Sequence, residues 1–441
     1  MGIPLPLLHS TATKRSFSGA DIPESAIFQS CVRCGLCLPH CPTYLETLTE
    51  TSSPRGRIHL IEAVAAGELS LTDPGFRHQM YQCLDCRACE AACPSGVQYG
   101  KLVESARTQI ERARPGNPLR QAFRRLIFQR LFGDMSFFRS FSRLLRLYQR
   151  SGLRFLARKL GILTLLRMEK MERLLPDMPA AFLIPANQEY PVTTAEQTPT
   201  RVALFAGCIM STAFAETDRA TIRVLNRAGC DVTLPQGQGC CGALTIHAGD
   251  MDEARKMARQ NIAAFEESGD EAIIINAAGC GAALKEYAHL LKDDSDYAER
   301  ATTFSRKVRD VSEFLAHRPQ SAALRKGKEP LKVTYQEPCH LVHAQRIRQE
   351  PRQLLRSLPG IELREMQESA LCCGSAGIYN LTQPEMSRRL QQRKIERIIA
   401  TGADVVVTAN PGCHLQLQAG LQEAGSKIRV RHIVDLLDQA D

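Results

Sequence analysis

Two runs of cysteines near the amino end constrain this chain more than any other feature. Both runs read C-x2-C-x2-C-x3-C-P. Each cysteine of the second run lies 52 positions after its counterpart in the first, as 83 minus 31 shows. The chain therefore contains an internal repeat, whose cysteines are Cys31, Cys34, Cys37 and Cys41, then Cys83, Cys86, Cys89 and Cys93.

Iron-sulfur clusters require this kind of spacing. Three thiolates two residues apart, on a loop that curls around a cube, reach three irons, and such soft centres select cysteine. Where two clusters are present, the fourth cysteine of each run, ahead of proline, ligates the other cluster. The sequence therefore predicts two [4Fe-4S] clusters, one on Cys31, Cys34, Cys37 and Cys93, and one on Cys83, Cys86, Cys89 and Cys41.

Two other uses of cysteine explain the pattern less well. A C-x2-C pair alone is typical of a zinc site or a redox dithiol, but a tetrahedral zinc site gives no reason for a linear pattern of eight cysteines. Disulfides suit short secreted chains, whereas this chain has 441 residues and no apolar secretory segment at its start. The 17 cysteines therefore indicate a reducing compartment in which thiolates bind metal.

The segment that contains the two runs is expected to be helical. Between the runs, Ser53-Pro54 is a helix start signal, and apolar residues then recur at helical spacing from Ile58 to Gly67. We therefore expect a helical ferredoxin domain with two clusters over residues 21–114, preceded by a flexible arm over residues 1–20.

A basic connector is expected over residues 115–198. From Arg120 to Arg173 there are 14 basic and three acidic residues, a net of +11, whereas the whole chain carries +9. One predicted helix has an apolar and a basic face: Phe137, Phe141, Leu144 and Tyr148, then Arg139, Arg143, Arg146 and Arg150. Such a helix lies on an anionic membrane, binds an acidic partner, or packs on its own protein with a solvated basic face. No motif that reads nucleic acid and no run of about 18 apolar residues is present, so neither nucleic-acid binding nor a transmembrane helix is expected.

The carboxyl half contains a second, longer repeat. A buried strand that ends in cysteine is predicted over Val202–Cys208 and again over Lys332–Cys339. In each copy a Cys-Cys-Gly sequence follows, and an apolar strand, Ile273–Ile275 or Val405–Val407, leads to a last cysteine. Helical stretches, such as residues 251–265 and 384–400, alternate with these strands, which is typical of a parallel sheet. We therefore expect two tandem α/β domains, over residues 199–322 and 323–441.

Each copy brings four cysteines to the end of its sheet where open α/β folds bind ligands. These candidate metal ligands are Cys208, Cys240, Cys241 and Cys280, then Cys339, Cys372, Cys373 and Cys413. The alternative is a redox dithiol, but a disulfide between adjacent cysteines forms a strained ring, so metal binding is favoured. Cys230 has no counterpart in the second copy and is interpreted as a buried structural thiol.

With both repeats in view, the chain resembles the iron-sulfur subunits of glycolate oxidase, also called glycolate dehydrogenase, which carry cysteine-rich CCG domains of the heterodisulfide-reductase type. The resemblance covers nearly all of residues 27–437. Besides the two cysteine runs, it rests on Ser53-Pro54-Arg55-Gly56-Arg57, Ala278-Gly279-Cys280-Gly281-Ala282 and Leu371-Cys372-Cys373-Gly374-Ser375-Ala376-Gly377. Within the first stretch, Arg55 and Arg57 either offset cluster charge, meet acidic groups of a partner, or are solvated.

The resemblance implies an α+β multidomain subunit with no substrate site of its own. FAD-binding glycolate oxidase subunits would oxidise glycolate to glyoxylate, and this chain would pass the electrons to the respiratory quinone pool. The cofactors implied are two [4Fe-4S] clusters and one or two further iron-sulfur clusters in the CCG domains, with FAD on the partner subunits only. The expected location is the cytoplasm, peripheral on the inner face of the cytoplasmic membrane.

The sequence departs from the disulfide-reductase pattern, which ends each CCG domain in C-x2-C. Ala283 and Gln416 stand where a fifth cysteine would be, so a five-cysteine noncubane cluster is in doubt. His340 and His343 follow Cys339 and are weaker ligand candidates.

Several functions stay open at this point. D-lactate or glycerol-3-phosphate are alternative substrates of the complex, because the substrate pocket is expected on another chain. A thiol or disulfide reductase with catalysis in the CCG domains is a second class, which the missing fifth cysteines count against. A sensor or scaffold without turnover is a third class.

Overall fold

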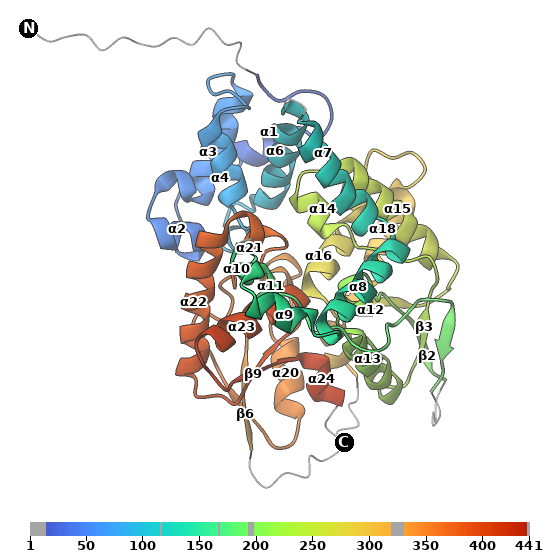
Figure 1. The fold of residues 1–441 in the computed structure, drawn as a ribbon. Coiled ribbons are helices and arrows are strands. Elements are labelled where there is room, and N and C mark those ends of the chain that lie inside the picture. Colours follow the sequence, from blue (N-terminus) through green and yellow to red (C-terminus); the bar gives the residue numbers. More distant parts are fainter. Residues whose placement is uncertain (1–14, 115–116, 166–167, 193–197, 319–329, 439–441) are drawn as a thin grey trace, which may run out of the picture.

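The computed structural model of this protein contains four parts that follow one another along the chain (Figure 1). It describes residues 15–114, 117–165, 168–192, 198–318 and 330–438. A helical amino-terminal part, in blue, leads to a helical connector in teal and green, and two α/β parts complete the chain in green to yellow and in orange to red. This mixture of helices and sheets agrees with the α+β class predicted from the sequence.

In the amino-terminal part, the described residues form helices and no strand. They are α1 (Ser25–Gln29), η1 (Leu38–His40), α2 (Pro42–Thr47), η2 (Glu50–Ser52), α3 (Pro54–Ala65), α4 (Pro74–Gln82), α5 (Ala88–Ala91) and α6 (Tyr99–Ala113). The predicted start of α3 is confirmed, because Ser53 Oγ accepts a hydrogen bond from the Gly56 amide at 3.0 Å. Ile61, Met80 and Leu102, from α3, α4 and α6, are fully buried in the core of this part.

Most of the arm predicted over residues 1–20 lies outside the described residues. Its described end is held against the helices. Ser16 Oγ donates a hydrogen bond to the Val64 carbonyl at 2.8 Å, and the Ser18 amide donates to Gln109 Oε1 at 3.0 Å. The chain is therefore fixed on the helical part from its first described residues onward.

The connector is a series of short helices. They are α7 (Pro118–Arg124), η3 (Arg125–Leu131), α8 (Met135–Arg150), α9 (Leu153–Lys159), α10 (Ile162–Leu165) and α11 (Glu169–Arg173). On α8, Phe138 and Ser142 are buried, whereas the apolar face predicted from the sequence is open: Phe137 is 43%, Phe141 46% and Leu144 62% exposed. The helix therefore packs on its own protein through a neighbouring face, and the predicted apolar face points to solvent.

The first α/β part is built on a five-stranded sheet in the order β1-β3-β2-β4-β5. The strands are β1 (Gln188–Tyr190), β2 (Thr200–Leu204), β3 (Cys230–Leu234), β4 (Ala272–Ile275) and β5 (Val308–Asp310). β1, from the segment predicted as connector, pairs antiparallel with β3, and the other pairs are parallel. The helices are α12 (Ile209–Thr212), α13 (Ala215–Arg227), α14 (Ala243–His247), α15 (Met251–Glu266), α16 (Ala278–Lys285), α17 (Tyr287–Leu290), α18 (Ala298–Lys307) and α19 (Val311–Ala316).

The second α/β part has a parallel four-stranded sheet in the order β7-β6-β8-β9. The strands are β6 (Leu331–Tyr335), β7 (Ile361–Arg364), β8 (Val405–Thr408) and β9 (Arg429–His432). The helices are η4 (His340–Ala344), α20 (Glu350–Ser357), α21 (Tyr379–Thr382), α22 (Pro384–Ala400), α23 (Pro411–Glu423) and α24 (Ile433–Asp438). Because β3-β2-β4-β5 and β7-β6-β8-β9 have the same order, the predicted duplication is confirmed.

The strand register corrects two details of the sequence analysis. Leu204 and Tyr335 are equivalent, because each ends the first strand of its copy. Leu204 pairs with Ile274 and Tyr335 pairs with Val407, so Ile274 corresponds to Val407. The match of the two sequences places Ile275 there instead. A run of similar β-branched residues cannot fix its own register, so the slip is invisible in the sequence. In addition, β2 and β6 end four residues before their cysteines, Cys208 and Cys339, and not at them.

The two α/β parts share one apolar core, which contains residues of both sheets, such as Leu204 and Val407. Hydrogen bonds also join them. His432 Nε2 donates to the Asn276 carbonyl at 2.8 Å, and the Gly279 amide donates to Asn410 Oδ1 at 3.1 Å. The two copies thus form one folded unit.

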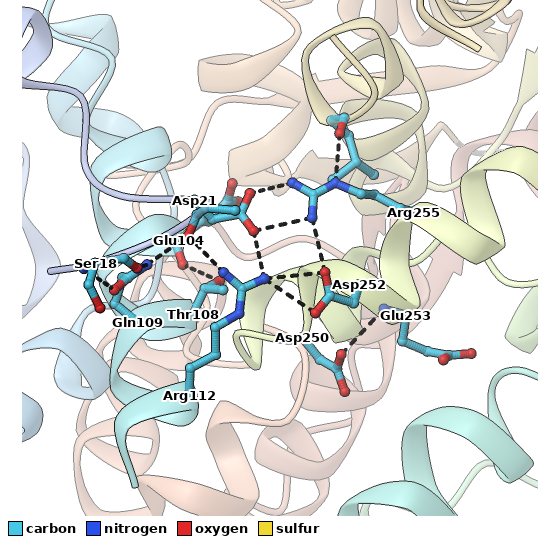
Figure 2. A network of polar contacts seen from close by, with 12 residues as sticks. Ser18, Asp21, Glu104, Thr108, Gln109, Arg112, Asp250, Asp252, Glu253 and Arg255 are labelled. Atoms are coloured by element: carbon cyan, nitrogen blue, oxygen red, sulfur yellow. Dashed lines mark hydrogen bonds and ion pairs between the residues drawn. The ribbon is translucent and has the colours of Figure 1, made fainter. Parts of the chain in front are cut away.

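The amino-terminal part is tied to the first α/β part by a charged network (Figure 2). Asp21 accepts a hydrogen bond from Arg112 of α6 at 2.8 Å and is also bound by Arg255 of α15. Arg112 in turn reaches Asp252 at 3.2 Å. Across the described parts of the chain, no helix combines the length and the apolar character needed to span a bilayer.

Candidate metal centres

The two cysteine runs adopt the same backbone curl. In the first run, Arg33 and Gly35 have positive φ angles of 55° and 84°, and in the second run Asp85 and Arg87 have φ angles of 55° and 61°. These positions are related by the same offset of 52 as the cysteines. Left-handed residues are rare outside glycine and persist where the surroundings impose them. The repeat therefore encodes the same pair of left-handed positions twice, one on each side of the second cysteine of each run.

Four cysteines predicted for one cluster meet around a single small cavity, which Cys41, Cys83, Cys86 and Cys89 line. The set combines three cysteines of the second run with the last cysteine of the first run. Burial raises the pKa of Cys83 and Cys86, so that as free groups they would be protonated thiols at neutral pH. A bound metal cluster would hold them as thiolates, and the donor set fits such a cluster.

Two buried arginines shape the surroundings of this set. Arg57, 1% exposed, lines the same cavity and donates to Thr43 Oγ1 at 3.0 Å and to the Gln79 carbonyl at 2.8 Å. Arg107 donates to the carbonyl of Cys83 at 2.6 Å. The hypothesis that Arg57 is a solvated surface residue is therefore excluded, and its positive charge lies beside the cysteines of this set. Arg55, in contrast, is partly exposed and pairs with Glu50 at 2.7 Å.

The other predicted set lies nearer the surface. Cys34 is exposed, and Cys31, Cys37 and Cys93 are partly exposed. Partial burial raises the pKa of Cys37 to about 11. Cys31 and Cys93, far apart in the sequence, both border the core of the amino-terminal part. The two predicted cluster sites thus differ in solvent access, since the first has no buried cysteine and the second has three.

The eight cysteines of the α/β parts form two tetrads. In the first, Cys208 Sγ and Cys240 Sγ are 3.7 Å apart, and in the second, Cys373 Sγ and Cys413 Sγ are 3.4 Å apart. A disulfide requires about 2.05 Å, whereas two thiolates on one tetrahedral metal at about 2.3 Å lie about 3.8 Å from each other. Neither pair is therefore a disulfide, and the sulfurs of each pair are close enough together to bind one metal ion.

Both tetrads face the same cavity of about 310 Å³. Phe132 and Leu174 of the connector also line it, and Phe138 packs with Cys208 in an adjoining apolar cluster. This role of the connector was not predicted from the sequence. The residue that could have indicated it is Phe138, which follows Phe137 of the predicted apolar face. Only the packing shows that Phe138 is the buried one.

Comparisons with known proteins agree with this arrangement. A family described as 4Fe-4S dicluster domain matches residues 27–97, and one described as cysteine-rich domain matches residues 202–285 and 333–418. The linker region of glycolate oxidase iron-sulfur subunits matches residues 119–175. A probable glycolate oxidase iron-sulfur subunit of Bacillus subtilis is 44% identical over 416 residues, 93% of either chain. The chain belongs to the family of glycolate oxidase iron-sulfur subunits.

Two further relatives show how far the likeness extends. The glycolate oxidase iron-sulfur subunit of Escherichia coli is 35% identical over 428 residues, 95% of either chain. Lactate utilization protein A of Oceanobacillus iheyensis is 30% identical over 241 residues, which are 54% of this chain and 96% of that protein. The resemblance predicted from the sequence is confirmed, and as a glycolate oxidase iron-sulfur subunit the chain is part of an oxidoreductase complex.

In this family member, the positions of the missing fifth cysteines are filled by other contacts. Gln416, 2% exposed, donates from Nε2 to Ser387 Oγ at 3.1 Å, and Ala283 is buried. The two weaker ligand candidates each donate from Nε2 to a backbone carbonyl, His340 to Asp85 at 2.9 Å and His343 to Ala370 at 3.0 Å. The cysteines thus remain the principal candidate metal ligands of the two tetrads.

Proposed function

We propose that this chain relays electrons singly from glycolate, oxidised to glyoxylate on an FAD-binding partner subunit, toward the respiratory quinone pool. Iron-sulfur clusters supply one-electron redox chemistry. Cys31, Cys34, Cys37 and Cys93 would hold the first cluster, and Cys41, Cys83, Cys86 and Cys89 the second. The residues of this chain position these groups and shield them from water.

The observation that carries the proposal is the spatial order of the cysteine groups, from the surface of the protein to its interior. The first cysteine set is open to solvent at Cys34. In the second set Cys41, Cys83 and Cys86 are buried, and Cys86 packs with Cys372 and the partly buried Cys339 of the second tetrad. The cysteine groups thus extend from the exposed Cys34 to the second tetrad in the α/β half. Electron transfer along a chain of clusters requires such an arrangement.

The exposed entrance also offers a contact surface for the flavin subunit. On either side of Cys34 in the sequence, the apolar side chains of Val32 and Leu36 are 70% and 56% exposed. Exposed apolar residues that cluster beside a redox site are typical of a protein interface. Docking here would bring a partner's flavin next to the first cluster.

The connector supports a peripheral position on the inner face of the cytoplasmic membrane. Besides Phe137, Phe141 and Leu144, its exposed apolar residues include Phe155 at 69% and Leu165 at 84%. Basic residues outnumber acidic ones 14 to three from Arg120 to Arg173. Apolar side chains with surrounding arginines suit an anionic lipid surface.

The relay is tested by Cys37→Ser in the purified complex. We expect loss of quinone reduction by glycolate, while glycolate still reduces the flavin, because only the path beyond the flavin is cut. The matched control is Cys230→Ala, a buried thiol outside both sets and both tetrads, which should leave quinone reduction unchanged. Loss of flavin reduction in Cys37→Ser would place this chain in the catalytic site and contradict the proposal.

D-lactate is the second candidate substrate of the complex, since one relative carries the name lactate utilization protein A. The two candidates are separated by measuring flavin reduction in the complex with glycolate and with D-lactate. Because the substrate is bound by the partner, the outcome does not change the relay assigned to this chain.

A further inference from the structure

A buried lysine distinguishes the second tetrad from the first. Lys394 of α22 is 1% exposed. Its Nζ donates to the carbonyls of Glu368 and Ser369, the latter at 3.1 Å, in the segment that leads to Cys372. The Glu368 carboxylate is occupied by Arg393 at 2.7 Å and Arg397 at 3.3 Å. Within the described ranges, Lys394 forms no ion pair with a carboxylate at 4.0 Å or less.

The sulfurs of the second tetrad lie close to this part of α22, because Cys373 and Cys413 pack in one buried cluster with Ile395, the residue after Lys394. Burial lowers the pKa of Lys394 to about 8, whereas the thiols of Cys373, Cys372 and Cys413, followed by the Glu368 carboxylate, act in the opposite direction. Burying an ammonium group without a counter-ion is strongly unfavourable. Thiolates bound to metal would supply the missing negative charge.

The first tetrad has a neutral amide at the equivalent position, Asn261 of α15. The starts of α15 and α22, at residues 251 and 384, differ by 133, as do 261 and 394. The glycines after the two cysteine pairs support this match, because Gly242 faces Ala254 and Gly374 faces Ser387, also 133 apart.

Asn261 performs the same structural task without a charge. Its Oδ1 accepts from the Gly239 amide at 2.8 Å, and its Nδ2 donates to the Cys240 carbonyl at 2.9 Å. An uncharged side chain is therefore sufficient to hold the loop before a cysteine pair. The ammonium of Lys394 adds an electrostatic effect that this task does not require.

We propose that Lys394 is a positioning residue that raises the reduction potential of the metal centre on the second tetrad above that of the centre on the first. This inference rests on the proposed relay, in which the tetrads hold redox-active metal. Each reduction adds one electron and no proton, so the centre gains one negative charge, which a fixed ammonium in a low-dielectric interior stabilises. Because the second tetrad packs beside Cys86, its centre would draw electrons out of the ferredoxin half.

The test is a redox titration of the full chain, prepared without oxygen and followed by EPR in the absence of substrate and partner. Loss of a signal in Cys373→Ser identifies the centre on the second tetrad. In Lys394→Met, at the potential that half-reduces the wild-type centre, the ratio of reduced to oxidised centre should fall at least about tenfold, or 59 mV for one electron.

The matched control is Arg389→Met, which removes the same charge from an exposed position of the same helix, where Arg389 pairs with Glu385. Solvent screens that charge, so the ratio should change less than about twofold. Lys394→Gln, which copies the amide of the first tetrad, should behave like Lys394→Met.

Three outcomes would overturn the proposal. One is an unchanged ratio in Lys394→Met at wild-type iron content. Another is loss of iron from both Lys394 variants, which would assign Lys394 a purely structural role. The third is a full set of EPR signals in Cys373→Ser, which would remove redox-active metal from the second tetrad but leave the relay through the two ferredoxin clusters intact.

Discussion

His247 Nδ1 lies 3.0 Å from Asp85 Oδ2, and this contact joins the first α/β part to the loop of the second cysteine run. Burial would raise the pKa of Asp85, but the hydrogen bond from His247 and the nearby charges of Arg107 and Arg87 hold it below its usual range. The backbone carbonyl of Asp85 accepts from His340 of the second α/β part. One loop residue thus fixes both α/β parts against the ferredoxin domain.

Removing the imidazole should leave a buried carboxylate without its main partner. We expect His247→Leu to lower the free energy of unfolding by about 3 kcal/mol, because the buried Asp85 carboxylate loses a hydrogen-bond partner and keeps its desolvation cost. Chemical denaturation of the full chain under anaerobic conditions measures this. The double variant His247→Leu with Asp85→Asn should recover part of the loss, since the carboxylate that lost its partner is then removed.

A surface histidine provides the control for this cycle. His59 is 65% exposed at its side chain and pairs with Glu62, so His59→Leu should change the free energy of unfolding by less than about 1 kcal/mol. Equal losses in His247→Leu and His59→Leu would contradict the role assigned to the Asp85 contact.

The junction between the two α/β parts should weaken in acid. His432, fully buried, donates from Nε2 to the Asn276 carbonyl and accepts the Val434 amide at Nδ1, so its neutral form is required. Burial lowers its pKa from 6.5 to about 4. The unfolded chain therefore binds the proton first, and the stability that is present above about pH 6.5 is lost as the pH falls toward 4.

The expected loss from His432 alone is about 2 kcal/mol at about pH 5, at 1.36 kcal/mol per pKa unit. Burial also lowers the pKa of His340 and of His414. The quantity to measure is therefore the difference in unfolding free energy between the wild type and His432→Gln. Denaturant midpoints between about pH 7 and about pH 5 should fall less steeply in the variant. Parallel profiles would show that His432 does not titrate on unfolding.

The exposed apolar face of α8 should control binding to membranes. Phe141→Glu together with Leu144→Glu is expected to weaken cosedimentation with phosphatidylglycerol vesicles by at least about tenfold, because both side chains leave the lipid and add negative charge. Binding of the wild type should also fall with added salt. Leu381→Glu, at a residue that is 46% exposed and lies on α21, is the control and should bind as the wild type does.

Equal binding to vesicles of phosphatidylcholine alone, or no effect of the α8 double variant, would contradict binding of this face to an anionic membrane. The exposed apolar face would then be assigned to contact with a protein partner. The partner can then be sought by binding of the purified flavin subunit to the same variants.

The sequence was most informative where its pattern follows directly from local geometry. The sequence correctly predicted two helix limits, the start of α3 at Ser53-Pro54 and the extent of α22 over Pro384–Ala400. Helix ends can be predicted in this way because they depend on neighbouring residues. The strand equivalence of Ile274 and Val407 was not predicted, since similar apolar residues allow several registers and hydrogen bonding selects one.

The candidate sites divide in the same way. The chain order alone established which sixteen cysteines recur in paired positions and that the family is that of glycolate oxidase iron-sulfur subunits. Only tertiary structure decided that both tetrads open to one cavity, that Arg57 is buried beside sulfur, and that the helix with buried Lys394 packs on the second tetrad. Spacing is a property of a few consecutive residues, whereas burial and charge pairing depend on elements that meet only when the chain folds.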